Sequence, residues 1–165
     1  MKFRLLIVLL MIGVPSMFAG IGVRAAVQND LADLRYKTAQ FYRPEMAQEA
    51  GYILIPALDY CFNNTGIGAM NSHYINTSLF DTTVDLLQPE VMVYTPDFSG
   101  KLQLSAVEYV VPAAEWDATH SELPQVLGHD FHLNRSLGLY TIYIWIWKNN
   151  PSGMFEDRNP KISCG

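Results

Sequence analysis

LYTIYIWIW, at residues 139–147, is the strongest strand signal in the chain. Apart from its first leucine, every residue of this run is β-branched or aromatic, and such residues favour the extended conformation of a sheet. Side chains alternate between the two faces of a strand, so Tyr143, Trp145 and Trp147 are expected to share one face. The run ends at the turn-forming sequence NNPSG at 149–153. We therefore expect a domain that contains a β-sheet.

A second sheet signal lies upstream of this run. Residues 88–94 and 101–111 form two apolar stretches, separated by a turn at 97–100, which is typical of a β-hairpin. The segment 112–138 then follows, which is polar and interrupted by proline and glycine. We expect this segment to be a long irregular loop, a kind of segment that often acts as a lid.

The N-terminal part of the chain has helical periodicity. Apolar or aromatic residues recur every three or four positions over residues 28–42, which predicts a helix. Pro44 then starts a second predicted helix, which runs to Ala50 and stops at Gly51. Helices followed by several strands indicate an α+β domain. We expect an N-terminal helical segment packed on an antiparallel β-sheet or a partly closed barrel, with one disulfide.

The first residues are typical of a cleavable secretory signal. Lys2 and Arg4 precede an apolar run at 5–14, and a zone of small residues follows. The apolar run is shorter than the roughly 20 residues that a membrane-spanning helix needs. We expect cleavage after Ala25, with Ala19 as the competing site and an uncleaved membrane anchor as the alternative.

This assignment divides the chain into a signal peptide at 1–25 and a single globular domain at 26–165. The predicted location is secreted or periplasmic. No second long apolar stretch is present, so no stable membrane insertion is expected after cleavage. The predicted mature chain has 8 basic and 16 acidic residues, and a formal charge of −8. Such an acidic surface repels nucleic acid, which excludes nucleic-acid binding from the expected functions.

The two cysteines, Cys61 and Cys164, both lie in the predicted mature chain. Two thiols in an oxidising compartment can form one bridge, which here would tie the end of the chain to an upstream loop. In the chain-entropy treatment, closing a loop of this length stabilises the fold by about 4–5 kcal/mol. The alternative is a pair of metal-binding thiolates, although the sequence has no CxxC motif.

Candidate site residues come from single histidines and carboxylates, because the sequence has no phosphate-binding loop, GxGxxG, HExxH or GxSxG motif. His73 follows a glycine-rich turn, and Glu108 lies inside the apolar run 101–111. A carboxylate there either faces solvent or has a buried partner, because an unpaired buried charge is costly. An imidazole and a carboxylate together can form the start of a metal or acid–base site. The plainer alternatives are a structural histidine and a solvent-facing glutamate.

Two weaker patterns accompany these residues. His129 and His132 form an HxxH pair near His120, which could capture a metal but more often belongs to a polar loop. The aromatic row of the run 139–147 could stack on a flat ligand such as a sugar, although such rows more often form a wall of the core.

Several short motifs in series resemble a family of small secreted bacterial proteins that are known mainly as hypothetical proteins. The motifs are GxMxxHY at 68–74, QPE at 88–90, VEYxVP at 107–112, WxW with NPxG at 145–153 and NPxxSC at 159–164. The resemblance covers nearly the whole predicted mature chain and implies a cysteine where Cys61 stands. It implies no activity, because none is established for the family.

The resemblance also bears on the candidate site. Family members usually have histidine in the position of Tyr143, and often an acidic residue in that of Thr141. With His73 and Glu108, that histidine would complete a His–Glu–His metal or acid–base centre. This chain departs from the family pattern with a tyrosine.

Two functions from different classes are consistent with these residues. The first is a ligand-binding or accessory domain whose pocket is lined by His73, Glu108, Tyr143, Trp145 and Trp147. The second is an enzyme that depends on a divalent transition metal, with His73 and Glu108 as ligands beside Tyr143 and the long loop as a lid. Both functions require the side chains of His73 and Glu108 to approach each other in the fold.

Overall fold

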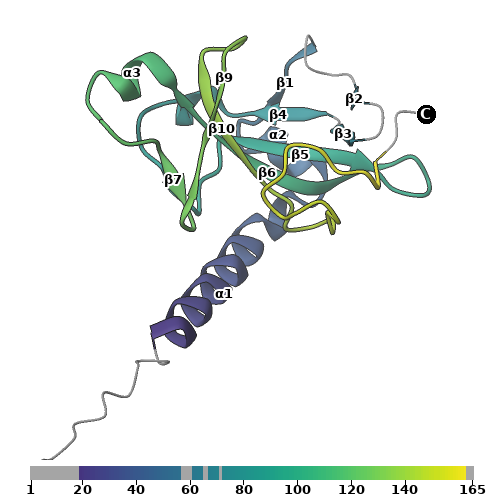
Figure 1. The fold of residues 1–165 in the computed structure, drawn as a ribbon. Coiled ribbons are helices and arrows are strands. Elements are labelled where there is room, and N and C mark those ends of the chain that lie inside the picture. Colours follow the sequence, from purple (N-terminus) through teal and green to yellow (C-terminus); the bar gives the residue numbers. More distant parts are fainter. Residues whose placement is uncertain (1–18, 57–60, 65–66, 71, 163–165) are drawn as a thin grey trace, which may run out of the picture.

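The computed structural model describes residues 19–56, 61–64, 67–70 and 72–162 of the chain (Figure 1). The helical elements are α1 (Ala19–Thr38), the 3-10 turn η1 (Ala39–Phe41), α2 (Pro44–Glu49), the 3-10 turn η3 (Thr77–Leu79) and α3 (Ala113–Asp117). The strands are β1 (Ile53–Leu54), β2 (Phe62–Asn64), β3 (Gly68–Met70), β4 (His73–Ile75), β5 (Val91–Pro96), β6 (Leu102–Pro112), β7 (Gln125–Val126), β8 (His129–Asp130), β9 (His132–Asn134) and β10 (Leu139–Ile144).

Six of these strands form one antiparallel sheet in the order β1-β4-β5-β6-β10-β9. Two further strand pairs, β2-β3 and β7-β8, lie outside it. The edge strands β1 and β9 have only 2 and 3 residues, too little strand to close the sheet on itself, and the sheet is open. The α+β class with a mostly antiparallel sheet is therefore confirmed, and the partly closed barrel is wrong.

The sheet separates two groups of buried side chains. The helix-side face carries Met92, Tyr94, Val107, Tyr109 and Ile142, which pack with Leu34 of α1 and Ala47 of α2. The opposite face, called the site face below, carries Val91, Val93, Ala106, Val110 and Tyr143, which pack with Met70 of β3 and with Ile162. Helices therefore cover one face, whereas the β2-β3 pair and the C-terminal segment cover part of the other.

Only the C-terminal end of α1 packs on the sheet, and the rest of the helix extends away from it (Figure 1). Leu34 and Thr38 are fully buried, and Thr38 Oγ1 donates a hydrogen bond to the carbonyl oxygen of Leu34 at 2.8 Å. Tyr36, on the outer side of the same helix, is 85% exposed. The predicted helix at 28–42 is thus part of a longer one that continues into η1.

The predicted cleavage position after Ala25 lies in the exposed part of α1. Residues 1–18 of the predicted signal are outside the described residues. In the described part of the chain, no helix combines the length and apolar character needed to cross a membrane. Cys164 is also outside the described residues, so its bridge to Cys61 stays a prediction.

The predicted hairpin is present as β5 and β6, and two other segments differ from expectation. The segment 112–138 is more regular than the expected loop, because it contains α3, the β7-β8 pair and β9. The last strand, β10, ends at Ile144 instead of Trp147. It ends there because the next backbone N–H groups leave the ladder: that of Trp145 donates to the carbonyl oxygen of Met154 and that of Ile146 turns back to Ile144, both at 2.9 Å.

Candidate functional site

Three strands place His73, Glu108 and Tyr143 on the site face. In β6, alternation sends Ala106, Glu108 and Val110 to this face. Glu108 lies directly opposite Tyr143 of β10 in the strand register. The sheet thus brings together residues that are distant in sequence, as both functional hypotheses require.

The three side chains form a buried polar cluster. Nε2 of His73 lies 3.1 Å from the hydroxyl of Tyr143 and 3.8 Å from Oε2 of Glu108. The hydroxyl of Tyr143 also donates to Sδ of Met70 at 3.2 Å, and Tyr143 lies directly opposite Glu108 in the sheet. The exposed fractions are only 4% for His73, 8% for Glu108 and 5% for Tyr143. A polar group at this depth is costly unless it has partners, and the contacts within this cluster supply some of them.

Burial determines the protonation states of the cluster. It raises the pKa of Glu108 from 4.5 to about 8, mainly because the charged form is poorly solvated. The hydrogen bond from Tyr143 opposes this rise, whereas repulsion from Asp157 and Glu90 adds to it. Burial also raises the pKa of Tyr143 well above its usual value. At neutral pH Glu108 therefore keeps its proton and is available as a hydrogen-bond donor.

The cluster faces a cavity of about 550 Å³. Ligand-binding cavities in proteins have similar volumes and combine apolar walls with a few polar groups. The apolar wall here includes Ile55, Ile75, Phe80, Val91, Val110 and Leu139. The remaining polar and charged lining includes Thr141, His132, Asp157 and Arg158.

His132 and Asp157 form an ion pair at the cavity wall. Nε2 of His132 lies 3.1 Å from Oδ1 of Asp157 and 3.1 Å from Oγ1 of Thr141. The hydrogen bond to Asp157 raises the pKa of His132. Because the two side chains are 48% and 37% exposed, this pair is closer to solvent than the His73 cluster.

The two predicted tryptophans do not line the cavity. The ring of Trp145 stacks on Tyr143 with a centroid distance of 6.3 Å, and its Nε1 donates to the carbonyl oxygen of Glu156. Trp147 lies on the helix-side face, because the chain turns after β10, and its Nε1 donates to Thr38 Oγ1 at 3.0 Å. The shared face predicted for the aromatic row therefore ends at Trp145.

The other histidines are not brought into a common site. His129 stacks on Phe155 and His120 stacks on Trp116, while His132 faces Asp157. Among the described residues, no group of three or more His, Cys, Asp or Glu side chains is placed to hold a metal ion. The predicted metal set of His73 and Glu108 thus has Tyr143 as its third member, and the part of the chain that the structure describes adds no further carboxylate or imidazole ligand.

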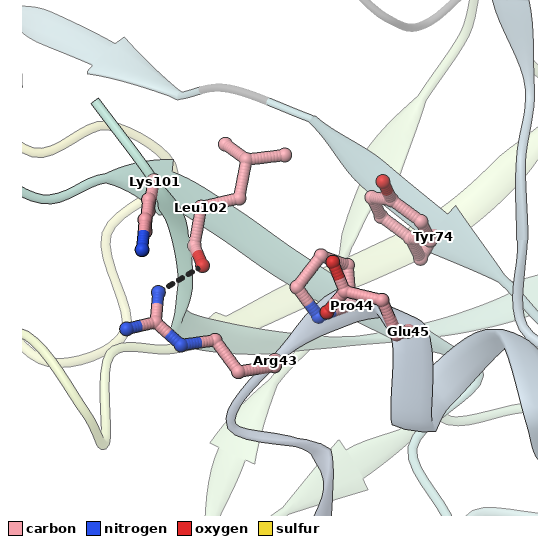
Figure 2. Close-up of a pocket in the computed structure, with 6 residues that line it drawn as sticks. All are labelled: Arg43, Pro44, Glu45, Tyr74, Lys101 and Leu102. Carbon is pink, nitrogen blue, oxygen red and sulfur yellow. Dashed lines mark hydrogen bonds between the residues drawn. The ribbon is translucent and has the colours of Figure 1, made fainter. Parts of the chain in front are cut away.

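A second hollow of about 530 Å³ lies beside α2, bounded by Arg43, Glu45, Tyr74 and Lys101 (Figure 2). The guanidinium of Arg43 already has partners within the protein. Its Nη1 donates to the carbonyl oxygen of Leu102 at 2.7 Å and lies 3.6 Å from Oδ2 of Asp97. These contacts attach the start of α2 to the β5-β6 hairpin. We therefore place the candidate site at the His73 cavity.

Sequence reasoning missed His132, Thr141, Asp157 and Arg158 as parts of this cavity. Thr141 had a usable signal, because it lies two residues before Tyr143 in the same strand and so on the same face. Asp157 and Arg158 had none, because they follow β10 in a segment without regular structure.

Comparison with protein-family models, curated proteins and solved structures finds no match. The resemblance to small secreted bacterial proteins therefore stays a prediction. The geometry and chemistry of the cavity are the basis for the function proposed below.

Proposed function

We propose that this chain is a secreted or periplasmic domain that binds a small ligand in the His73 cavity. The observation that carries the proposal is a cavity of about 550 Å³ whose walls are largely apolar and which is lined by the buried His73–Glu108–Tyr143 cluster. The location rests on the predicted signal peptide at 1–25.

A purely structural role accounts poorly for such a cluster. Replacing a buried polar network by apolar side chains of similar volume is often neutral or stabilising, so polar groups at this depth are better explained by a task. Here they line a cavity, where they can orient a ligand whose apolar part lies against the wall. An accessory protein that carries such a ligand has the same requirements.

The metal-dependent enzyme remains the alternative prediction. Fewer metal ligands support it, because the third residue beside His73 and Glu108 is a tyrosine, where the family resemblance implies a histidine. Tyrosine ligates metals only after it loses its proton, and burial raises the pKa of Tyr143. Elemental analysis of the purified protein therefore accompanies the ligand experiment below.

The test is a ligand-observed NMR screen with a fragment library of anionic, cationic and neutral compounds. We expect fragments to bind the parent protein and to bind Tyr143→Phe several-fold more weakly, because this variant loses the hydroxyl that links His73 and Glu108. Tyr140→Phe is the matched control. It removes a hydroxyl from the same strand, one that donates to Asp117 Oδ1 on the other side of the sheet.

Either of two results would contradict the proposal. One is a parent protein that binds no fragment, and the other is equal loss of binding in both tyrosine variants. Near-stoichiometric metal in the parent, lost in His73→Ala, would move the assignment to the metal-dependent alternative.

A further inference from the structure

Arg158 lines the cavity, and its guanidinium makes no hydrogen bond or ion pair with the described residues. Its Nε is sealed from solvent and makes no hydrogen bond in the described part of the chain. The charged or potentially charged side-chain pairs among the described residues are Arg43–Asp97, His73–Glu108 and His132–Asp157, and none includes Arg158. A guanidinium has five N–H donors, and no acceptor among the described residues pairs with those of Arg158, which leaves them for an acceptor from outside this part of the chain.

The backbone around Arg158 is held firmly. Its carbonyl oxygen accepts a hydrogen bond from Nδ2 of Asn150 at 2.9 Å. The next residue, Asn159, is fully buried and exchanges two backbone hydrogen bonds with Ala69, at 3.2 and 3.1 Å. These backbone contacts fix the position from which the Arg158 side chain reaches the cavity.

The neighbouring acids leave the positive charge of Arg158 uncompensated. Asp157 is paired with His132, and the carboxyl group of Glu108 faces Nε2 of His73 at 3.8 Å. The cavity therefore combines one unpaired cation with apolar walls, an environment that favours an anion over a cation or a neutral molecule.

We propose that the ligand of this cavity is a small amphipathic carboxylate, whose carboxylate group pairs with Arg158 and whose apolar body packs against Ile75, Phe80, Val110 and Leu139. The inference deepens the proposed function and rests on it. A guanidinium suits this role because it can give two parallel hydrogen bonds to one carboxylate. The apolar wall favours an aliphatic or aryl acid over inorganic phosphate.

Two acid–amide pairs test the inference by isothermal titration calorimetry at pH 7. The probes are hexanoate with hexanamide, and benzoate with benzamide, so each acid is compared with a neutral molecule of nearly the same shape. Inorganic phosphate serves as an anion without an apolar body. We expect at least one acid to bind, and to bind roughly tenfold or more tightly than its amide and than phosphate.

The variants are Arg158→Gln and the control Arg135→Gln. Arg135 is exposed and lies between two residues of the cavity lining without lining it, so the control removes the same charge nearby. We expect Arg158→Gln to weaken acid binding roughly tenfold or more and to leave the amides unchanged, and Arg135→Gln to match the parent. Arg158→Lys, which keeps the charge, is expected to fall between parent and Arg158→Gln.

Three results would overturn the inference: no acid binds, an amide binds as tightly as its acid, or phosphate binds as tightly as both acids. The parent-protein comparison of acids with amides decides the matter even where Arg158→Gln fails to fold. Each of these results leaves the proposed function standing if the fragment screen yields ligands sensitive to Tyr143→Phe. Failure of that screen in turn removes the proposed function itself.

Discussion

At the scale of single residues, the chemistry of the site follows from the position of Glu108 in the sheet. Tyr143 and His73 approach it from β10 and β4, and Asp157, Glu90 and Arg158 are ionisable groups that act electrostatically on Glu108 or Tyr143. Burial outweighs the hydrogen bond from Tyr143, so the protonated form prevails at neutral pH. This carboxyl group should therefore influence the stability of the protein as the pH changes.

We expect the free energy of unfolding to fall as the pH rises from about 4.5 to about 8. Over this range Glu108 is ionised in the unfolded chain but protonated in the native one, so the native state binds more protons and loses stability with rising pH. Above about 8 both states are ionised and the loss levels off. Glu90, whose pKa burial also raises to about 8, adds to the same slope.

Glu108→Gln should reduce this pH dependence. Between pH 4.5 and 8 the variant should lose less free energy of unfolding than the parent, by on the order of a few kcal/mol. Urea unfolding at pH 5, 6.5 and 8 measures the effect. Glu49→Gln, which changes an exposed acid on α2, should keep the slope of the parent. An unaltered slope in Glu108→Gln would show that this carboxyl group is ionised in the native protein.

Some residues of the candidate site could be predicted from the sequence, and others could not. His73 and Glu108 could be nominated because an imidazole after a turn and a carboxylate in an apolar strand are unusual choices, and the structure brings them together. Arg158 could not be nominated, because nothing around it in the sequence distinguishes it from a surface arginine. Its significance comes from long-range backbone pairing, which local patterns do not encode.

At the scale of elements, the C-terminal segment after β10 completes the site by running back over the sheet (yellow in Figure 1). It lies so close to β3 that Gly68 has no room for a side chain: a Cβ there would lie 2.4 Å from the backbone carbon of Asn159. Gly68 also has a φ of +109°, which side-chain-bearing residues rarely adopt. A substitution at Gly68 therefore tests the contact between β3 and Asn159.

We expect Gly68→Ala to destabilise the protein by more than about 2 kcal/mol, because left-handed strain is combined with a backbone clash. The control is Gly100→Ala in the β5-β6 turn, where φ is +81° but nothing lies within 4 Å of the new Cβ. That variant should lose only the strain, about 1–2 kcal/mol. Chemical denaturation of both variants measures the difference, and equal losses would contradict the close approach at Gly68.

Elements also differ in how well the sequence predicts them. The hairpin of β5 and β6 and the helix α2 were predictable because turn residues and proline mark their ends locally. The end of β10 was not, because it is set by backbone hydrogen bonds from Trp145 to Met154 and from Ile146 back to Ile144. The same holds for β9, whose pairing with β10 makes a strand of what reads as polar loop.

At the scale of the whole molecule, the sheet separates structural support from the candidate site. Helices cover one face, and the cavity lies on the other. The α+β class could be predicted because it depends on the order of helical and extended patterns along the chain. The openness of the sheet could not, since it depends on how short the edge strands β1 and β9 are.

The projecting part of α1 should contribute little to the stability of this molecule. We expect a chain that begins at Ala26 to have a free energy of unfolding within about 0.5 kcal/mol of that of a chain that also contains residues 23–25. The reason is that the side chains of these residues are exposed. Leu34→Ala, which truncates a fully buried side chain of the same helix, should cost about 2–5 kcal/mol. Thermal and urea unfolding of both proteins test this, and a large loss in the shortened chain would refute it.

The pairing of Ala69 with Asn159 also sets the order in which the protein can acquire its function. A chain emerges from the ribosome or a translocation channel with its N-terminus first, so the β5-β6 hairpin can form while the residues around Asn159 are still to come. Such a distant contact carries a loop-closure cost that the hairpin does not. Arg158 is thus delivered to the cavity late in synthesis, and a chain interrupted just before it would have most of its sheet but not the cation that we propose as the ligand's partner.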